Sequence, residues 1–211
     1  MPSSELFTKK ISDLTFAVVD TETTGMNPAF SRVMDIGIVI MKNGEVVEKW
    51  ETLIDPEQEV PYWISKYTHL THAMVKGMPT FETYAGKISE FLKDAIFVGH
   101  NAAFDYSFLY HEMLRAKTAF NYPKLCTVML GRKLLPQLAN AHLDALADFY
   151  NIKISQRHRA LPDAEATAFV LNEFIKIAQE KYGARTYFDL ERLQKLYIDK
   201  EVANSDLALF A

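Results

Sequence analysis

Residues 14–54, LTFAVVDTETTGMNPAFSRVMDIGIVIMKNGEVVEKWETLI, contain three strand-like runs separated by turns, and this stretch decides the fold class. Leu14–Asp20 is a short apolar run of the kind that forms a buried strand. Arg32–Met41 is a second such run, and the Asn-Gly pair after it is a strong hairpin signal leading into Glu45–Ile54. We therefore expect three antiparallel strands in this part of the chain.

The rest of the sequence is mostly helical, with one further apolar strand expected over Ala95–Gly99. Helices are expected over Phe81–Lys93, Ala102–Ala116, Cys126–Leu135, Leu143–Tyr150, Asp163–Gln179 and Thr186–Leu196. This order of elements predicts an α/β fold, a mixed central β-sheet flanked by α-helices. No linker or low-complexity tract divides the sequence, so we expect one domain over residues 1–180, followed by a C-terminal helix and tail over 181–211.

The composition is that of a globular protein, with 49% hydrophobic and 24% charged residues among 211, which excludes a wholly disordered chain. A single cysteine, Cys126, excludes an internal disulfide and a cysteine-based zinc site. Met1–Lys10 does not resemble a signal peptide, and no apolar run approaches the ~20 residues of a membrane span. We expect a cytoplasmic protein with no membrane partner.

Four carboxylates fall where apolar side chains are expected. Asp20 ends the first apolar run and Glu22 follows two positions later, so both point to the same side if the strand continues. Asp105 lies among apolar neighbours inside a predicted helix, and Asp163 heads the apolar stripe of the last long helix. Singly, Asp20 can end a turn and Asp163 can cap a helix. Jointly, four acids pointed at one interior repel one another.

No basic residue lies on the faces that carry these acids, so we expect divalent cations to neutralise them. Ligands that offer only oxygen favour Mg²⁺ or Mn²⁺ over zinc. His158, five residues before Asp163, can remove a proton from an attacking water, although a solvated surface histidine is the bland alternative. Cations would also explain how a chain of net charge −4 can act on a phosphate backbone.

Three motifs resemble those of the DEDDh 3′→5′ exonucleases: Asp20-Thr-Glu-Thr-Thr-Gly25, Gly99-His-Asn-Ala-Ala-Phe-Asp105 and His158-Arg-Ala-Leu-Pro-Asp163. The branch with the greatest similarity contains the proofreading epsilon subunits of bacterial DNA polymerase III and their stand-alone relatives. The resemblance runs from about Leu14 to Gln179. It implies a ribonuclease H-like fold, and it makes residues 1–180 an exonuclease domain.

The resemblance also implies a two-metal hydrolysis in which Asp20, Glu22, Asp105 and Asp163 hold two Mg²⁺ or Mn²⁺ ions and His158 is the general base. The product would be a nucleoside 5′-monophosphate, released from the 3′ end of single-stranded or frayed DNA during replication, proofreading or repair. Positions that match substrate contacts of the family are Thr23, Thr24, Gly25, Met26, Thr68, His100, Asn101 and Phe104. Plain core packing is the alternative for Met26 and Phe104.

The segment between the first two motifs departs from the family at His69, where a glycine is usual. This substitution weakens the assignment of Thr68 as a base contact. The aromatic residues Tyr62, Trp63 and Tyr67 in the same segment can stack on an unpaired base or form a hydrophobic lid.

The expected partners are nucleic-acid 3′ ends and a polymerase. Asp206-Leu-Ala-Leu-Phe210 resembles the pentapeptide by which bacterial replication proteins dock in the sliding clamp, with Asp in place of the usual Gln. The other interpretation of this tail is that it packs on its own domain.

Two alternative functions stay open at the level of sequence. One is an RNA-directed 3′ exonuclease similar to oligoribonuclease or RNase T, since sequence does not show whether a 2′-hydroxyl is recognised. The other is a non-catalytic module that binds nucleic acid or a clamp. The intact set of four acids and His158 argues against a pure binding module.

Overall fold

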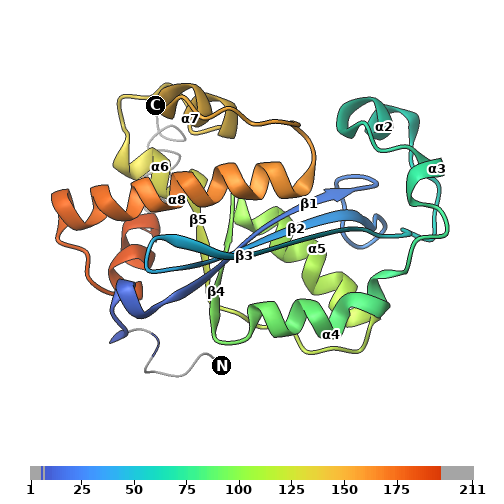
Figure 1. Ribbon diagram of the computed structural model, residues 1–211, viewed down its shortest axis with the longest axis horizontal. Helices are drawn as coiled ribbons and strands as arrows, with labels where there is room; N and C mark the ends of the chain where they lie inside the picture. Colours follow the sequence, from blue (N-terminus) through green and yellow to red (C-terminus); the bar gives the residue numbers. More distant parts are fainter. Residues whose placement is uncertain (1–5, 7, 196–211) are drawn as a thin grey trace, which may run out of the picture.

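A five-stranded mixed sheet forms the centre of the protein, which a computed structural model describes at residue 6 and residues 8–195 (Figure 1). The strands are β1 (Thr15–Thr23), β2 (Val33–Lys42), β3 (Glu45–Leu53), β4 (Ala95–Gly99) and β5 (Lys124–Cys126). Their order across the sheet is β3-β2-β1-β4-β5. The pairs β1–β2 and β2–β3 are antiparallel, whereas β1–β4 and β4–β5 are parallel. The mixed α/β sheet and the three antiparallel strands are thus confirmed.

The hairpin between β2 and β3 has the backbone that its sequence predicts. Asn43 and Gly44 both have positive φ, +50° and +78°. A two-residue turn of this kind matches the right-handed twist of the strands it joins, and Asn-Gly is the pair that adopts it most readily.

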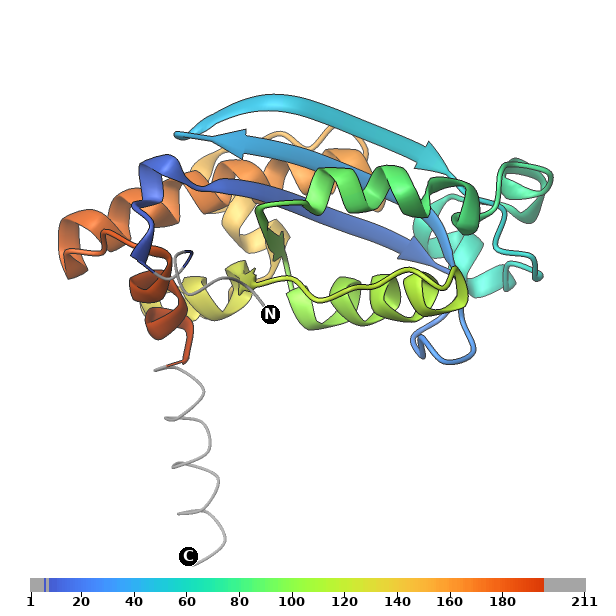
Figure 2. The same ribbon diagram turned by 90° about the horizontal axis from the view of Figure 1, so that it is seen from below.

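Helices cover both faces of the sheet (Figures 1 and 2). The described helices are η1 (Ile11–Asp13), α2 (Tyr62–Thr68), α3 (His72–Val75), α4 (Phe81–Leu92), α5 (Ala102–Arg115), α6 (Thr127–Leu134), α7 (Leu143–Tyr150) and α8 (Ala160–Tyr182), and residues 187–195 are helical as well. The long helix α8 crosses one face with α6 and α7 beside it, while α4 and α5 lie on the other face. Every helix that the sequence predicts is present, and each end that falls among the described residues lies within three residues of its predicted position; the predicted end at Leu196 lies outside them.

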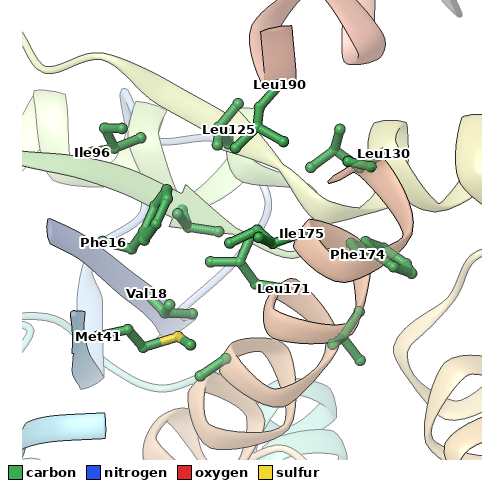
Figure 3. Packing of buried hydrophobic residues seen from close by; sticks show 14 of the residues in the cluster. Phe16, Val18, Met41, Ile96, Leu125, Leu130, Leu171, Phe174, Ile175 and Leu190 are labelled. Carbon is green, nitrogen blue, oxygen red and sulfur yellow. The ribbon is translucent and has the colours of Figure 1, made fainter. Parts of the chain in front are cut away.

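Successive side chains of β1 point alternately into two hydrophobic cores. Phe16 and Val18 point into a cluster with α6 and α8, and Ala17 and Val19 point into a second cluster with α4 and α5. Figure 3 shows the first cluster, where Phe16 and Val18 face Leu171 of α8. The same alternation carries past Val18 to Asp20 and Glu22, so the strand that builds the core also aims two acids toward the side of α8.

A glycine allows α8 to approach the sheet closely. A Cβ on Gly37 of β2 would lie 2.4 Å from the backbone nitrogen of Leu161 and 2.5 Å from the carbonyl carbon of Ala160, both in the first turn of α8. Gly37 is also the cross-strand partner of Asp20. The close contact therefore places the start of α8, and with it Asp163, against the strand that carries Asp20.

Two short helices and one short strand were not predicted. The helices α2 and α3 stand beyond the end of β1, where Ile64, Leu70 and Val75 form a small separate core with Met34 and Val60. The strand β5 takes three residues, and so the helix expected from Cys126 begins at Thr127. Segments this short carry too few periods for a hydrophobic pattern to be recognised.

The helical residues 187–195 pack back on the first core through Tyr187, Leu190 and Leu193, all of which are buried. In the part of the chain that the structure describes, no helix is both long and apolar enough to span a bilayer.

Candidate functional site

The four predicted acids and His158 line one cavity of about 530 Å³ at the carboxyl end of β1. They come from four different parts of the fold. Asp20 and Glu22 lie on β1, Asp105 on α5, Asp163 in the first turn of α8, and His158 in the loop before that helix. Residues separated by more than 140 positions in the sequence are thereby brought to one site.

Asp105 is tied to β1 by two hydrogen bonds. The backbone N–H of Thr21 donates to its Oδ1 over 2.9 Å, and the hydroxyl of Thr21 donates to the same oxygen over 2.8 Å. Thr21 lies between Asp20 and Glu22 on the strand. Its side chain points to α5 while the side chains of its neighbours point toward α8, so one residue fixes α5 relative to the two acids.

Burial raises the pKa values of all four carboxyl groups, and repulsion within the cluster adds to this effect at Asp20 and Glu22. The pKa of Asp20 is raised well above its usual value by burial, and further by Asp105, Glu22 and Asp163. Burial is also the largest cause for the others, and it raises the pKa of Glu22 to about 8, of Asp105 to about 7 and of Asp163 to about 6. Such a cluster strongly favours any cation that can enter it.

One basic side chain does reach the cluster, contrary to the expectation from sequence. The guanidinium of Arg157 contacts Oδ2 of Asp163 and also donates to Oδ1 of Asp144 over 2.5 Å. Arg157 also lowers the pKa values of Asp20 and Glu22, though less than burial raises them. The expectation failed because Arg157 comes from the loop before α8 rather than from a helix or strand face.

His158 is held at the rim of the cavity. Its backbone has a φ of +60°, and its ring packs against Tyr67 with 4.1 Å between ring centroids. Burial and the nearby Arg157 lower its pKa below the usual value. The imidazole is therefore neutral at neutral pH, which is the state that can accept a proton.

The donor set fits a hard divalent cation. Ligand atoms of Glu22, His158 and Asp163 lie within 4.8 Å of one another. Oδ1 of Asp163 is buried without a hydrogen-bond partner among the described residues, which suits an atom that ligates a metal. Asp20 and Asp105 line the same cavity without belonging to that compact group.

Three of the predicted substrate contacts line the cavity: His100, Asn101 and Phe104. Nδ1 of His100 lies 2.9 Å from the hydroxyl of Thr127, and burial lowers the pKa of His100 to about 4. Asn101 begins α5 in the left-handed conformation, with φ +71°. These three side chains and the four acids line the same cavity.

The other predicted substrate contacts are not brought into the cavity: Thr23, Thr24, Gly25, Met26 and Thr68. The hydroxyl of Thr23 donates to the carbonyl of Gly25. The hydroxyl of Thr24 accepts a hydrogen bond from the backbone N–H of Arg32. Met26 is 70% exposed, so core packing does not account for it. Thr68 is buried, and its hydroxyl donates to the carbonyl of Ile64.

His69 ends α2 in the left-handed conformation, with φ +61°. That conformation explains why glycine suits the position, since glycine alone adopts it without steric cost. His69 fills it here, and it faces the loop that carries His158, whose pKa it helps to lower.

Sequence reasoning missed Asp144 as a cavity-lining group, and it missed the contacts of Arg157 with Asp163 and of Tyr67 with His158. It also missed the pair of Arg159 with buried Asp35 at 2.8 Å. Asp35 and Arg159 tie β2 to the loop that carries His158. A signal existed for Asp35, which is a lone acid in the apolar run over Arg32–Met41. Its partner lies 124 positions away, and no local pattern shows such a pairing.

Comparisons with known proteins agree with this arrangement. A family model described as exonuclease, RNase_T, matches residues 17–171. DNA polymerase III subunit epsilon of Aquifex aeolicus (strain VF5) is 38% identical over 199 residues, which cover 92% of this chain and 96% of that protein. DNA polymerase III PolC-type of Bacillus subtilis (strain 168) is 34% identical over 174 residues, covering 81% of this chain and 12% of that polymerase. The chain thus corresponds to a small part of the PolC-type relatives.

Solved structures share the fold. Exonuclease X in complex with 5′ overhanging duplex DNA superposes with a TM-score of 0.68 at 24% identity, covering 86% of this chain and 99% of that chain. E. coli Exonuclease I in complex with a dT13 oligonucleotide superposes with a TM-score of 0.71 at 16% identity, covering 81% and 43%. These likenesses confirm the ribonuclease H-like α/β fold that the motifs imply.

Proposed function

The chain belongs to the RNase_T exonuclease family, and on this premise we propose that it removes nucleotides one at a time from the 3′ end of DNA. The protein is a nuclease, and the exonucleases of this family depend on divalent metals. The observation that carries the proposal is the convergence of four carboxylates, three of them buried, and one neutral histidine on a single cavity.

In the proposed reaction, Asp20, Glu22, Asp105 and Asp163 hold two divalent cations, Mg²⁺ or Mn²⁺. Cations held there would supply polarisation of the attacking water and positive charge next to the phosphate and the leaving 3′ oxygen. His158 accepts the proton of the water as its oxygen attacks phosphorus. The bond from phosphorus to the leaving 3′ oxygen breaks, which releases a nucleoside 5′-monophosphate and leaves a new 3′-hydroxyl on the shortened strand.

The terminal nucleotide would lie between the acids and the residues at the start of α5. His100, Asn101 and Phe104 line the cavity there and offer one apolar ring and two polar side chains. The loop over Thr23–Met26 follows directly on the acids of β1 and would contact the terminal sugar and base from outside the cavity. Thr68 would act through the backbone it holds, because its hydroxyl is already bonded.

We assign this activity to residues 1–180, with residues 181–211 as a C-terminal helix and tail. Similarity to a polymerase III epsilon subunit supports a role in proofreading or repair next to a polymerase, in the cytoplasm. DNA is favoured over RNA because the relatives reported above are DNA polymerase subunits and DNA exonucleases.

The test uses strands of matched sequence in DNA and RNA, each labelled at the 5′ end. With Mg²⁺, the wild type should shorten the DNA into a ladder of products, and EDTA should stop it. The Asp20→Ala variant should leave the DNA intact. A ladder that persists in EDTA, or one that Asp20→Ala produces as fast as the wild type, contradicts the proposal. Shortening of RNA alone would move the assignment to an RNA exonuclease.

We also propose that Asp206–Phe210 docks in a bacterial sliding clamp; this segment lies outside the described residues. Deletion of residues 207–211 should abolish capture of the chain on immobilised clamp while leaving the cleavage of short oligonucleotides intact. Equal capture of the full and shortened chains would remove this part of the proposal.

A further inference from the structure

Helix α2 exposes three aromatic side chains beside the cavity. Tyr62 is 82% exposed, Trp63 57% and Tyr67 60%. The opposite side of the helix is anchored, because Ile64 and Thr68 are buried. The three rings are therefore not part of the core, and packing does not account for them.

Tyr67 connects this helix to the candidate site. It lines the same cavity as the four acids, and its ring packs on that of His158 with 4.1 Å between centroids. Trp63 lies four residues earlier, so it stands one turn further out on the same face of α2. Tyr62 is turned by about 140° from Tyr67 around the helix axis and does not share this face.

A second cavity adjoins the first at the C-terminal end of α2. This cavity, of about 490 Å³, is lined by His69, Gln156, Arg157, His158 and Arg159. It shares Arg157 and His158 with the first cavity, and His69 is the residue that ends α2. Open space thus leads from the acids past His158 to the C-terminal end of α2, where Tyr67 lies.

We propose that Tyr67 and Trp63 form a stacking track for unpaired nucleotides just upstream of the 3′-terminal one. The inference rests on the proposed exonuclease function and names the form of its substrate, a single-stranded DNA end. Aromatic rings bind successive bases by their faces regardless of sequence, and a strand held in a duplex does not offer those faces. Tyr67 would meet the first upstream base and Trp63 the second.

The first test separates substrates by length. Trp63→Ala should raise KM for an oligothymidine of eight nucleotides about tenfold, a typical loss for one stacked base, without lowering kcat. KM for the thymidine dinucleotide should stay unchanged, because that substrate ends before it reaches Trp63. Tyr62→Ala is the matched control, an exposed ring of the same helix on another face, and should leave both KM values as they are. Equal KM values for Trp63→Ala and the wild type on the longer strand, or an equal rise in Tyr62→Ala, would overturn the track.

The second test observes stacking directly. The sequence has two tryptophans, and the other one, Trp50, packs on β3 against Tyr84 and Phe91. In a Trp50→Phe variant all tryptophan emission comes from Trp63. A single-stranded oligothymidine with phosphorothioate linkages, which resist hydrolysis, should quench this emission in a saturable way, and a blunt duplex or thymidine monophosphate should not. Unchanged emission while the labelled strand binds by anisotropy would reject the track.

The two tests keep the two claims apart. Quenching and binding without any shortening of DNA by the wild type would reject the exonuclease function and leave the stacking surface standing. Shortening of DNA with no quenching and no change of KM would reject the track alone. A third outcome is quenching of Trp63 while the wild type, Asp20→Ala and Trp63→Ala all bind the labelled strand equally well. This outcome would assign the aromatic surface to another partner and would also overturn the track.

Discussion

Glu22 holds its proton at neutral pH unless a cation displaces it. Burial raises its pKa to about 8, with Asp163, Asp35 and Asp105 adding repulsion. A metal-free cluster of this kind holds protons at neutral pH, and a divalent cation must displace them to bind. The exposed carboxyl groups behave in the opposite way. Among the described residues, Asp55, Asp144 and Asp189 have pKa values that are lowered.

Glu22→Gln keeps the shape of the side chain and removes its charge. We expect kcat with Mg²⁺ to fall by about 10²–10³, the usual loss when one group that stabilises transition-state charge is removed. The melting temperature in EDTA should stay level or rise, because a buried group that repels its neighbours is gone. Activity near that of the wild type would show that Glu22 does not belong to the proposed metal-binding site.

At the scale of residues, sequence showed the acids but not their companions. Asp20, Glu22, Asp105 and Asp163 stand out because each is a charge in an apolar pattern. The contacts of Arg157 with Asp163 and of Tyr67 with His158 could not be predicted, because a loop arginine and a tyrosine in a short helix have no pattern that shows their partners. Their roles depend on which loops meet in space, and this is set by the packing of α2 and α8 at the end of the sheet.

Among the elements, the first turn of α8 is placed by its contact with Gly37 on β2. Gly37→Ala would put a Cβ within 2.4–2.5 Å of backbone atoms that cannot rotate away. Overpacking of this kind costs about 1–3 kcal/mol, so the melting temperature should fall by several degrees. The kcat should fall as well, since the displaced turn carries Asp163.

Gly86 provides the matched control for that change. It lies inside α4, and a Cβ there would meet nothing within 4 Å. Gly86→Ala should therefore stabilise the protein by up to about 1 kcal/mol, the difference in helix propensity, with kcat unchanged. The melting temperatures and kcat values of the two variants, measured side by side, check the pair. Equal behaviour of both variants would mean that close packing at Gly37 does not position the site.

Sequence predicted the long elements well and the short ones poorly. The strands β1 to β4 and the helices α4 to α8 have apolar patterns that extend over at least five residues. The strand β5 and the helix α3 have three and four residues, and they exist because neighbouring elements pair or pack with them. The helix α2, which carries the exposed aromatic residues, was likewise set by the small core around Met34 rather than by its own pattern.

For the whole molecule, the buried acids link stability to pH. Their raised pKa values mean that the folded state keeps protons that the unfolded state has lost, so the free energy of unfolding falls as the pH rises. His100 acts in the opposite sense, because its pKa is lowered to about 4 and its contribution rises with pH up to about 6.5. The effect of the acids is therefore cleanest above that value.

We expect the melting temperature in EDTA to fall between about pH 6.5 and 8, the interval in which the folded protein loses the protons of Glu22 and Asp105. Each proton that the folded state retains and the unfolded state has lost lowers the free energy of unfolding by at most about 1.4 kcal/mol per pH unit, or roughly 3–6 °C in the melting temperature. Excess Mg²⁺ should remove most of this fall, because bound cations stabilise the ionised cluster. Thermal melts with and without EDTA across this interval check both statements. A melting temperature that rises with pH in EDTA would contradict the assigned pKa shifts.

The overall charge of −4 is compatible with this arrangement. A protein that grips a long duplex by its backbone needs a basic face, whereas an enzyme that holds only the end of one strand needs local positive charge. Bound cations, together with Arg157 and Arg159 beside the cavity, would supply it where the acids lie.

Calorimetric titration of the metal-free protein with Mn²⁺, repeated in buffers of different ionisation enthalpy, measures cation binding and proton release together. We predict saturable binding of two ions per chain with release of protons, more at about pH 6.5 than at about pH 8, and weakened binding in Glu22→Gln. Absence of saturable binding, or binding without proton release at either pH, would contradict the assignment of the buried acids as one metal-holding cluster.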